Sequence, residues 1–521
     1  MNSESSRSFF ASSRLTLIIT LLLLFGLGLG IRLFDLTDLP LDFHPTRQLL
    51  SALKARGMYF QTAPNIPDWQ RQMALQQWKT KAEVEPEVFE HLVAFTYRFT
   101  GEELWVARVY SSLFWIIGGI FLFLLVRDLI STDGAVIATA YYLFFPYAVI
   151  ASRSFQPDPL MVMLIIIFWW MVTRWVTPLR PPPNSKNLGG EKEGGWAFAL
   201  LAGLVGGLAI FIKFYAAFFV IGGALGALLG KFNLRELIRK PQVWAMAVLG
   251  ILPAAGYLFY GIVLNGFLGQ QFSGRFIPSL LLSPLNYVQW ALKANMAAGG
   301  LMIMLGLLSP FFVRERRARF FIYGLWIAYI LFGLFFDYHI ATHDYYHLAF
   351  IPIVAVSLAQ VADWFANQLA SLASKPWMKI AAYIILLYGL LVTIWDARNQ
   401  MKSVDYRPQA AMWAQIGDTL GHGKGVVALT QDYGSRLAYW GWQNASIWPN
   451  SGDIDYHDVR GASFDFKRTF DNLTKNKDYF LVTDFEELNR QPDLRNQLAA
   501  YPIFQQGDGY IIYDLTRLVS K

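Results

Sequence analysis

Residues 14–48 read RLTLIITLLLLFGLGLGIRLFDLTDLPLDFHPTRQ, an apolar run followed by a short acidic motif that contains Asp42. A helix that crosses a bilayer needs about 20 predominantly apolar residues, and the run from Leu15 to Leu33 is close to that length. Arg7 and Arg14 precede the run, and no small-residue cleavage site accompanies it. We therefore expect a retained signal anchor with a cytoplasmic N-terminus, which places Asp42 next to the membrane surface.

The composition indicates a membrane protein with many spans. Of 521 residues, 55% are hydrophobic and only 16% are charged, whereas soluble domains carry about 25% charged residues. With the first run, eleven spans are predicted, the others near 104–125, 134–150, 159–176, 196–212, 214–230, 242–264, 296–313, 320–336, 348–366 and 378–395.

The charge distribution sets the expected orientation. Basic residues gather in the short loops of one side, including the low-complexity linker at 178–195, which is the positive-inside pattern. The net charge of +7 is explained in this way, so we expect no nucleic-acid partner. Cysteine is absent, which excludes disulfides and a thiol nucleophile. We expect a multi-pass protein of the plasma (inner) membrane.

Three segments are then expected on the outer side: 34–103, 265–295 and everything after Asp396. The first mixes aromatic and charged residues, as is typical of short helices in the plane of the interface. The last alternates β-type runs at 425–430, 478–483 and 509–515 with helical stretches, which indicates a small α/β domain. The predicted fold is mainly α, with a membrane module at 1–395 and an extracytoplasmic α/β domain at 396–521.

Two carboxylates lie just outside apolar runs on the same predicted face. Asp42 is accompanied by His44 and Arg47, and Asp158 follows Pro157 at a helix start, where the helix dipole favours an anion. Arg153 is the expected charge partner of Asp158. Taken singly, Asp42 is an ordinary loop carboxylate and Asp158 an ordinary helix cap, but two carboxylates on one surface suggest an active site.

Further ionisable residues on this face are candidates for the same site. Glu85, like Glu87 or Glu90, is placed to turn back toward Asp42. Lys213, in FIKFYAAFF, either snorkels to the interface or holds a phosphate as a compact point charge. Arg275 in the 265–285 region is a further phosphate candidate, with a plain surface arginine as the alternative.

The stretch FFDYHIATHDYYHLAF, residues 335–350, holds three of the seven histidines. On a continuous helix His339, His343 and His347 would share one face at i, i+4 spacing and offer ligands to a metal. The stretch joins two spans and is expected to bend, so we favour phosphate binding by its histidines and tyrosine hydroxyls. An interfacial belt of tyrosine and histidine is the remaining alternative.

The order of these motifs resembles that of the GT-C membrane glycosyltransferases, in particular bacterial relatives of protein O-mannosyltransferases and aminoarabinose transferases. The matching segments are DFHPTRQ, EPEVFEHLVAFTYRFTGEELW, SRSFQPDPLM, GLVGGLAIFIKFYA and THDYYHLAF, in this order. Together they cover the membrane part, roughly Arg14 to Trp395. Many eukaryotic members have Asp-Glu where this chain has Asp42-Phe43, so no second carboxylate adjoins the first.

The resemblance implies a GT-C fold and an inverting transfer of a hexose or pentose from a polyprenyl-phosphate donor to a lipid, glycan or protein acceptor outside the membrane. Asp42 matches the family's general base, Asp158 the second acidic position and Glu85 the acidic residue near the second span. Lys213 with His343, Tyr345 and His347 matches the region that handles the lipid phosphate, to which Arg275 and Arg153 are added as candidates. A divalent metal is left open.

Three other functions fit parts of the pattern. A transporter or flippase for lipid-linked sugars also needs polar residues among its spans, but it usually places them near mid-bilayer and contains repeats, neither of which is seen here. A polysaccharide ligase or polymerase would use the same class of donor but transfer a whole glycan. A scaffold whose outer domain binds partners would not need Asp42 for its function.

Overall fold

The computed structural model describes residues 8–81, 85–177, 195–269, 275–372, 375–459 and 463–519. The chain divides into two compact units. The first contains Met1–Leu36, Glu83–Phe89 and Ala107–Ser403, and the second contains Thr37–Ala82, Glu90–Val106 and Val404–Lys521. The linker expected at 178–195 lies outside the described residues except for its last position. The long apolar helices belong to the first unit and the sheet to the second.

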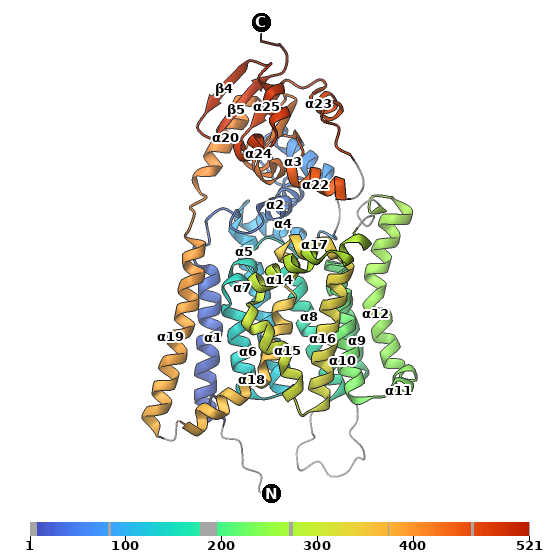
Figure 1. The fold of residues 1–521 in the computed structure, drawn as a ribbon, viewed down its shortest axis with the longest axis vertical. Coiled ribbons are helices and arrows are strands. Elements are labelled where there is room, and N and C mark those ends of the chain that lie inside the picture. The colour runs from blue at the N-terminus through green and yellow to red at the C-terminus, as the bar shows by residue number, and fades with distance from the viewer. Residues whose placement is uncertain are drawn as a thin grey trace. The chain divides into compact units, whose positions relative to one another are not determined.

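The first unit is a bundle of long helices whose axes are roughly parallel (Figure 1). In chain order its elements are α1 Arg14–Leu33, α5 Trp105–Leu129, α6 Thr132–Phe144, α7 Pro146–Ala151, α8 Asp158–Val176, α9 Trp196–Ile212, α10 Ala216–Lys231, α11 Leu234–Ile238, α12 Pro241–Leu258, η1 Phe259–Leu264, η2 Pro278–Leu282, α14 Pro284–Ala298, α15 Gly300–Phe312, α16 Arg316–Phe335, α17 Asp337–Thr342, η3 Asp344–His347, α18 Phe350–Leu372 and α19 Pro376–Met401.

Each of the eleven segments expected to span the membrane is helical. Within the described ranges, seven helices are long and apolar enough to cross a bilayer, and the pair α14 and α15, bent by 94°, would make an eighth. The spans expected at 196–212 and 214–230 correspond to α9 and α10, which have 17 and 16 residues. The span expected at 134–150 is broken into α6 and α7 at Pro146, because proline begins a new helix more readily than it continues one.

Glycine allows the helices of this unit to approach closely. A Cβ atom on Gly226 of α10 would lie 2.8 Å from the carbonyl oxygen of Phe320 and 2.9 Å from the Cα of Phe321 in α16. On α9, a Cβ on Gly203 would lie 2.9 Å from the carbonyl oxygen of Met246 in α12. Packing through small residues is how helices associate in lipid, where burial of apolar surface gives little driving force.

The second unit contains a five-stranded mixed sheet in the order β2-β1-β3-β5-β4. Strand β1 pairs in parallel with β2 and β3, and β5 pairs antiparallel with β3 and β4. The three β-type runs expected from the sequence contain β1, β3 and β5, whereas β2 and β4 were not predicted. The strands are β1 Val426–Leu429, β2 Ala445–Ile447, β3 Tyr479–Val482, β4 Ile503–Gly507 and β5 Tyr510–Asp514.

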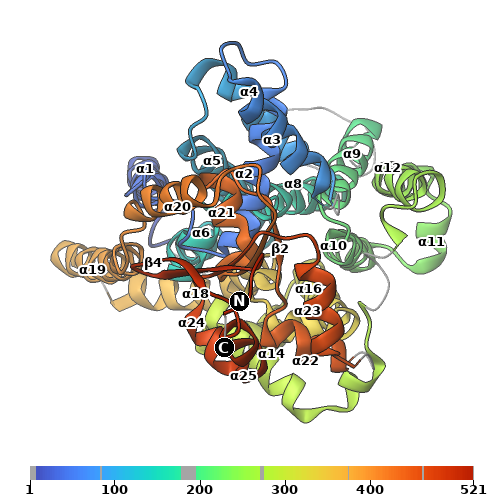
Figure 2. The same cartoon turned by 90° about the horizontal axis from the view of Figure 1, so that it is seen from above.

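Helices cover both faces of this sheet. Trp413 and Ile416 of α20 pack against Val426 and Leu481 on one face, and Phe470 and Leu494 lie in the core of the other face. Figure 2 shows α20 and α21 on one side of the sheet and α22 to α25 on the other. The helices that belong to the second unit are α2 Pro45–Phe60, α3 Asp68–Thr80, α4 Val88–Thr100, α20 Pro408–Leu420, η4 Gln431–Gly434, α21 Ser435–Trp440, α22 Ser451–Val459, α23 Phe466–Thr474, α24 Phe485–Arg490 and α25 Pro492–Leu498.

The early helices α2 and α3 share a core with α21, which is nearly 400 residues further along the chain. Arg56 of α2 is buried, and its Nε donates to Glu102 at 2.7 Å while its Nη1 donates to the carbonyl oxygen of Tyr439 at 2.6 Å. Gln77 of α3 donates to the carbonyl oxygen of Ala438 at 2.8 Å. The first loop and the C-terminal segment therefore fold together.

Candidate active site

Asp158, Lys213 and Tyr215 form a buried cluster in the first unit. Asp158 is the first residue of α8, and Lys213 lies between α9 and α10, where the chain leaves the helix. The Nζ of Lys213 lies 3.0 and 2.9 Å from the two carboxylate oxygens of Asp158, and Tyr215 Oη donates to one of them at 2.7 Å. Asp158 is 1% exposed and Lys213 2% exposed. Burial at this level shows that Lys213 does not snorkel.

Glu85 is a second acidic partner of the same lysine. Its Oε1 lies 3.4 Å from the Nζ of Lys213, and its side chain is 22% exposed against 1% for Asp158. Lys213 therefore bridges two carboxylates, with Asp158 held tightly and Glu85 held loosely at the more open side. Glu85, Glu87 and Glu90 were the three glutamates considered in the first loop. Among the described contacts, the one with Lys213 is made by Glu85.

Aromatic residues after α17 cover the cluster. The ring of Tyr346 stacks on that of Tyr215, with centroids 5.4 Å apart, and the Nζ of Lys213 lies 5.4 Å from the centroid of Tyr345. Arg275 donates from Nη1 to the hydroxyl of Tyr346 at 3.3 Å. The structure thus places Asp158, Glu85 and Tyr345 around Lys213, and Arg275 contacts Tyr346, which stacks on Tyr215.

The histidines do not form one helical face. The chain leaves α17 at His343 and resumes in the short helix η3, so the i, i+4 ladder is broken. His347 Nε2 donates to the carbonyl oxygen of Ile340 at 2.9 Å, which leaves Nδ1 to accept from Tyr329 at 2.8 Å. Among the described residues no group of three or more His, Cys, Asp or Glu side chains could hold a metal ion.

The other two histidines lie against each other. The rings of His339 and His343 stack with centroids 5.7 Å apart, and His343 Nδ1 lies 2.7 Å from Thr342 Oγ1. Burial, followed by the charges of Arg275 and His343, lowers the pKa of His339 to about 3. His339 is therefore neutral at physiological pH.

Arg153 has a different partner from the one expected. Its guanidinium donates to the carbonyl oxygens of Phe34 at 2.7 Å and Asp35 at 3.0 Å, at the end of α1. The ion-pair partner of Asp158 is Lys213 instead. The contacts of Arg153 indicate that it anchors α1 beside the turn that precedes α8.

Asp42 belongs to the second unit. Gln48 Nε2 donates to Asp42 at 3.4 Å and to the carbonyl oxygen of Phe43 at 2.6 Å. His44, next in the motif, has φ 44° and ends the loop before Pro45 starts α2. A non-glycine residue in this region is strained, and such strain often occurs at functional sites. Convergence of Asp42, His44 and Arg47 on the Asp158 cluster remains a prediction.

The linker to α20 braces the Asp42 loop within the second unit. The backbone N–H of Tyr406 donates to Asp38 at 3.1 Å. Burial, followed by the charge of Asp42, raises the pKa of the Tyr406 hydroxyl. Neither Tyr406 nor Tyr215 was predicted from the sequence; the place of Tyr215 two residues after Lys213 was the available signal.

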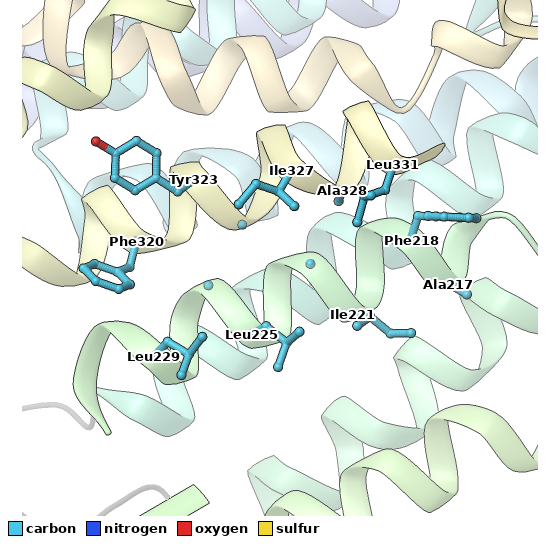
Figure 3. A pocket seen from close by; sticks show the side chains of 13 residues that line it. Ala217, Phe218, Ile221, Leu225, Leu229, Phe320, Tyr323, Ile327, Ala328 and Leu331 are labelled. Carbon is cyan, nitrogen blue, oxygen red and sulfur yellow. The ribbon is translucent and has the colours of Figure 1, made fainter. Parts of the chain in front are cut away.

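An apolar groove of about 500 Å³ runs between α10 and α16 of the first unit (Figure 3). It begins at Ala217, four residues after Lys213, and extends to Leu229. At a rise of about 1.5 Å per residue it is about 18 Å long. Its lining includes Phe218, Ile221, Leu225, Ile327 and Leu331 and is almost free of polar surface.

The helical bundle that carries these carboxylates and the lysine at one end has the fold of the solved structures of ArnT and of the archaeal oligosaccharyltransferase AglB. Residues 84–260 match the family model described as dolichyl-phosphate-mannose-protein mannosyltransferase. The matched segment includes Glu85, Asp158 and Lys213. The predicted resemblance and the mainly α fold are therefore confirmed.

Solved structures share this fold over most of the chain. ArnT from Cupriavidus metallidurans bound to undecaprenyl phosphate has a TM-score of 0.54 at 14% identity, covering 95% of this chain and 97% of that one. Its apo form has a TM-score of 0.55 at 12% identity, with the same coverage. The archaeal oligosaccharyltransferase AglB from Archaeoglobus fulgidus, in complex with an inhibitory peptide and a dolichol-phosphate, has a TM-score of 0.54 at 13% identity, covering 97% and 75%. No curated protein matches the sequence.

Proposed function

We propose that the protein is an inverting glycosyltransferase that moves a sugar from a polyprenyl-phosphate-linked donor to an acceptor at the extracytoplasmic face of the membrane. The observation that carries the proposal is the buried Lys213, held between Asp158 and Glu85 at the end of an apolar groove. A lipid carrier needs a cation for its phosphate and an apolar path for its tail. The fold shared with a structure bound to undecaprenyl phosphate supports this class of donor.

Phosphate binding would use Lys213 after Glu85 has moved aside. Asp158 holds the ammonium with two short contacts in a buried place, whereas Glu85 makes one contact of 3.4 Å and is more exposed. A phosphate that approaches from the open side would therefore replace Glu85 and leave Asp158 in position. Arg275 supplies a second cation beside Tyr346, and guanidinium groups suit phosphate oxygens.

His347 and Arg153 have supporting roles in this proposal. Both ring nitrogens of His347 are hydrogen-bonded inside the bundle, and Arg153 donates to two backbone carbonyls. Phosphate binding by either side chain would break these buried hydrogen bonds. Tyr345, whose ring faces Lys213, and His343 are better placed to border the phosphate.

The proposed chemical step is a displacement at the anomeric carbon. The acceptor hydroxyl oxygen attacks the anomeric carbon, the bond from that carbon to the phosphate oxygen breaks, and the polyprenyl phosphate leaves with the electron pair. Attack opposite to the leaving group inverts the anomeric centre. Asp42 takes the proton of the acceptor as general base, which contributes about 10²–10⁴-fold. Lys213 and Arg275 stabilise the charge that develops on the phosphate.

The groove between α10 and α16 would hold the isoprenoid tail. Ile221, Leu225, Ile327 and Leu331 line it and are each about half exposed, so an apolar chain laid along it would be covered by apolar contacts. The groove begins four residues after Lys213, which joins the site of the phosphate to that of the tail.

Purified protein in liposomes tests the proposal. Undecaprenyl phosphate bearing a radiolabelled hexose or pentose is supplied with candidate lipid, glycan and peptide acceptors, and both labelled product and released carrier are measured. We expect one carrier phosphate per sugar transferred, and loss of both in Asp158→Asn. Asp128→Asn is the matched control, because Asp128 pairs with Arg174 at the opposite end of α8.

Two outcomes of this experiment contradict the proposal. Movement of the intact sugar-carrier across the bilayer without release of carrier would identify a flippase. Transfer only from carriers that bear a whole glycan would identify a polysaccharide ligase or polymerase.

A further inference from the structure

The turn between α7 and α8 is buried throughout, and its polar side chains differ in whether they have hydrogen-bond partners. Ser152 Oγ accepts from Arg32 Nε at 2.7 Å, Ser154 Oγ donates to the carbonyl oxygen of Ala151 at 2.7 Å, and Arg153 donates to two carbonyl groups. Gln156 is 1% exposed, and neither its Nε2 nor its Oε1 has a hydrogen-bond partner within the described part of the chain.

An unsatisfied buried amide is costly. Folding removes its donor and its acceptor from water without replacing the lost hydrogen bonds, whereas a leucine or methionine of similar size would incur no such penalty. Native proteins leave few such groups, and each one calls for an explanation. A side chain that lowers stability in this way is typical of a binding site, where the ligand supplies the missing partners.

The neighbours of Gln156 place it beside the candidate active site. Phe155 packs edge-to-face on Phe89, with ring centroids 5.1 Å apart, so the turn contacts the segment that follows Glu85. On the other side, Asp158 is two residues away, which is at most about 7 Å along the chain, and it holds Lys213. Gln156 therefore lies in the same buried turn as Asp158, the carboxylate that holds Lys213.

We propose that the Gln156 amide binds a hydroxyl group of the transferred sugar. The inference rests on the proposed function and extends it to sugar recognition. A phosphate presents only acceptors and is matched by cations, whereas an amide offers a donor and an acceptor on adjacent atoms, as a sugar hydroxyl requires. A site built to hydrogen-bond a hydroxyl discriminates strongly against ligands that lack it.

The test compares the binding of bare carrier and of glycosylated carrier in the wild type and in a variant that lacks the Gln156 amide. Binding of bare undecaprenyl phosphate and of undecaprenyl phosphate carrying glucose, mannose, galactose or arabinose is measured for the wild type and for Gln156→Leu, with Gln156→Met as the alternative if the leucine variant does not fold. We expect the preferred glycosylated carrier to lose about tenfold in affinity, as expected for the loss of one to two hydrogen bonds, with bare carrier unchanged.

Gln443→Leu is the matched control. Gln443 is also 1% exposed, and its Oε1 has no hydrogen-bond partner within the described residues, but its Nε2 donates to the carbonyl oxygen of Lys424 at 2.8 Å in the second unit. We expect Gln443→Leu to lower the melting temperature without changing the preference for glycosylated carrier. Gln156→Leu should leave the melting temperature equal or higher, because it removes unsatisfied polar atoms.

The outcomes separate this inference from the proposed function. If the wild type binds no polyprenyl phosphate, the proposed function fails. If it binds both forms of carrier and Gln156→Leu keeps the full preference for the glycosylated one, or weakens both equally, sugar recognition by Gln156 is overturned while the glycosyltransferase proposal stands. A lowered melting temperature with unchanged binding would show that Gln156 is structural.

Discussion

The ion pair between Lys213 and Asp158 allows a quantitative test of how the site is built. Lys213→Met removes the ammonium 3.0 and 2.9 Å from the two oxygens of Asp158 and leaves a carboxylate that is 1% exposed. Breaking a buried pair from one side costs about 3–5 kcal/mol. Tyr215 still donates to Asp158 at 2.7 Å, so the carboxylate keeps one hydrogen bond that partly replaces its solvation. We therefore expect a loss near the lower limit, about 3 kcal/mol.

The double variant separates the ion pair from other effects of the lysine. Lys213→Met with Asp158→Leu removes both charges, and replacement of a buried pair by apolar residues is often neutral. Only the acceptor of the Tyr215 hydroxyl is then lost, which costs about 1–3 kcal/mol. Asp158→Leu alone should cost about as much as the double variant or slightly more, because the lysine that it leaves behind keeps Glu85 at 3.4 Å. The coupling energy between the two positions is then about 3 kcal/mol, close to the loss in Lys213→Met alone.

Equilibrium unfolding in mixed micelles, followed by circular dichroism, measures these free energies. Arg174→Met provides the reference, because Arg174 pairs with Asp128 at 2.8 Å while both side chains are partly exposed; such pairs contribute about 0–1 kcal/mol. If the losses of the two single variants simply add in the double variant, the two residues are not coupled and the buried ion pair is refuted.

Three further predictions concern the acidic residues and the histidine pair. Asp42→Asn should lower turnover by at least about 100-fold while carrier binding is retained, measured as transfer rate and as carrier affinity; near wild-type turnover would remove Asp42 as the base. Glu85→Gln should increase the affinity for undecaprenyl phosphate severalfold, because it removes the carboxylate that competes for Lys213; weaker binding would contradict displacement. The pKa of His339 falls from its usual 6.5 to about 3 on folding, so the unfolded state binds more protons and stability should decrease as the pH is lowered through this window, at up to about 1.4 kcal/mol per pH unit. Thermal unfolding at pH 6.5 and 4.5 measures this change in stability, which should be smaller in His339→Gln than in the wild type. If the change is the same in both proteins, the pH dependence belongs to other groups.

The sequence predicted the helical segments well because span length and apolar composition are local properties. It also located β1 and β3, whose buried residues form apolar runs, and β5, whose burial alternates along the strand. Strand β2 has three residues of intermediate burial, and β4, at the edge of the sheet, is mostly exposed. Neither strand shows the alternation or the apolar run by which strands are recognised.

Pairing between distant residues was harder to predict. Arg153 was expected beside Asp158 because it is five residues away, but Lys213, 55 residues away, is the partner. Both cations were visible in the sequence, and only the packing of α8 against α9 decides between them. Gln156 gave no signal at all, because an amide is unremarkable until its burial and its lack of partners are known.

The shared core of α2, α3 and α21 has a consequence for biosynthesis. The hydrogen bond from Arg56 to the carbonyl oxygen of Tyr439 cannot form until that residue, 383 positions later in the chain, has been synthesised. At a synthesis rate of about 5–20 residues per second, that interval lasts about 20–80 s. During this time a guanidinium that is buried in the folded protein stays hydrated, and the segment that carries Asp42 completes its packing only after α21 has been synthesised.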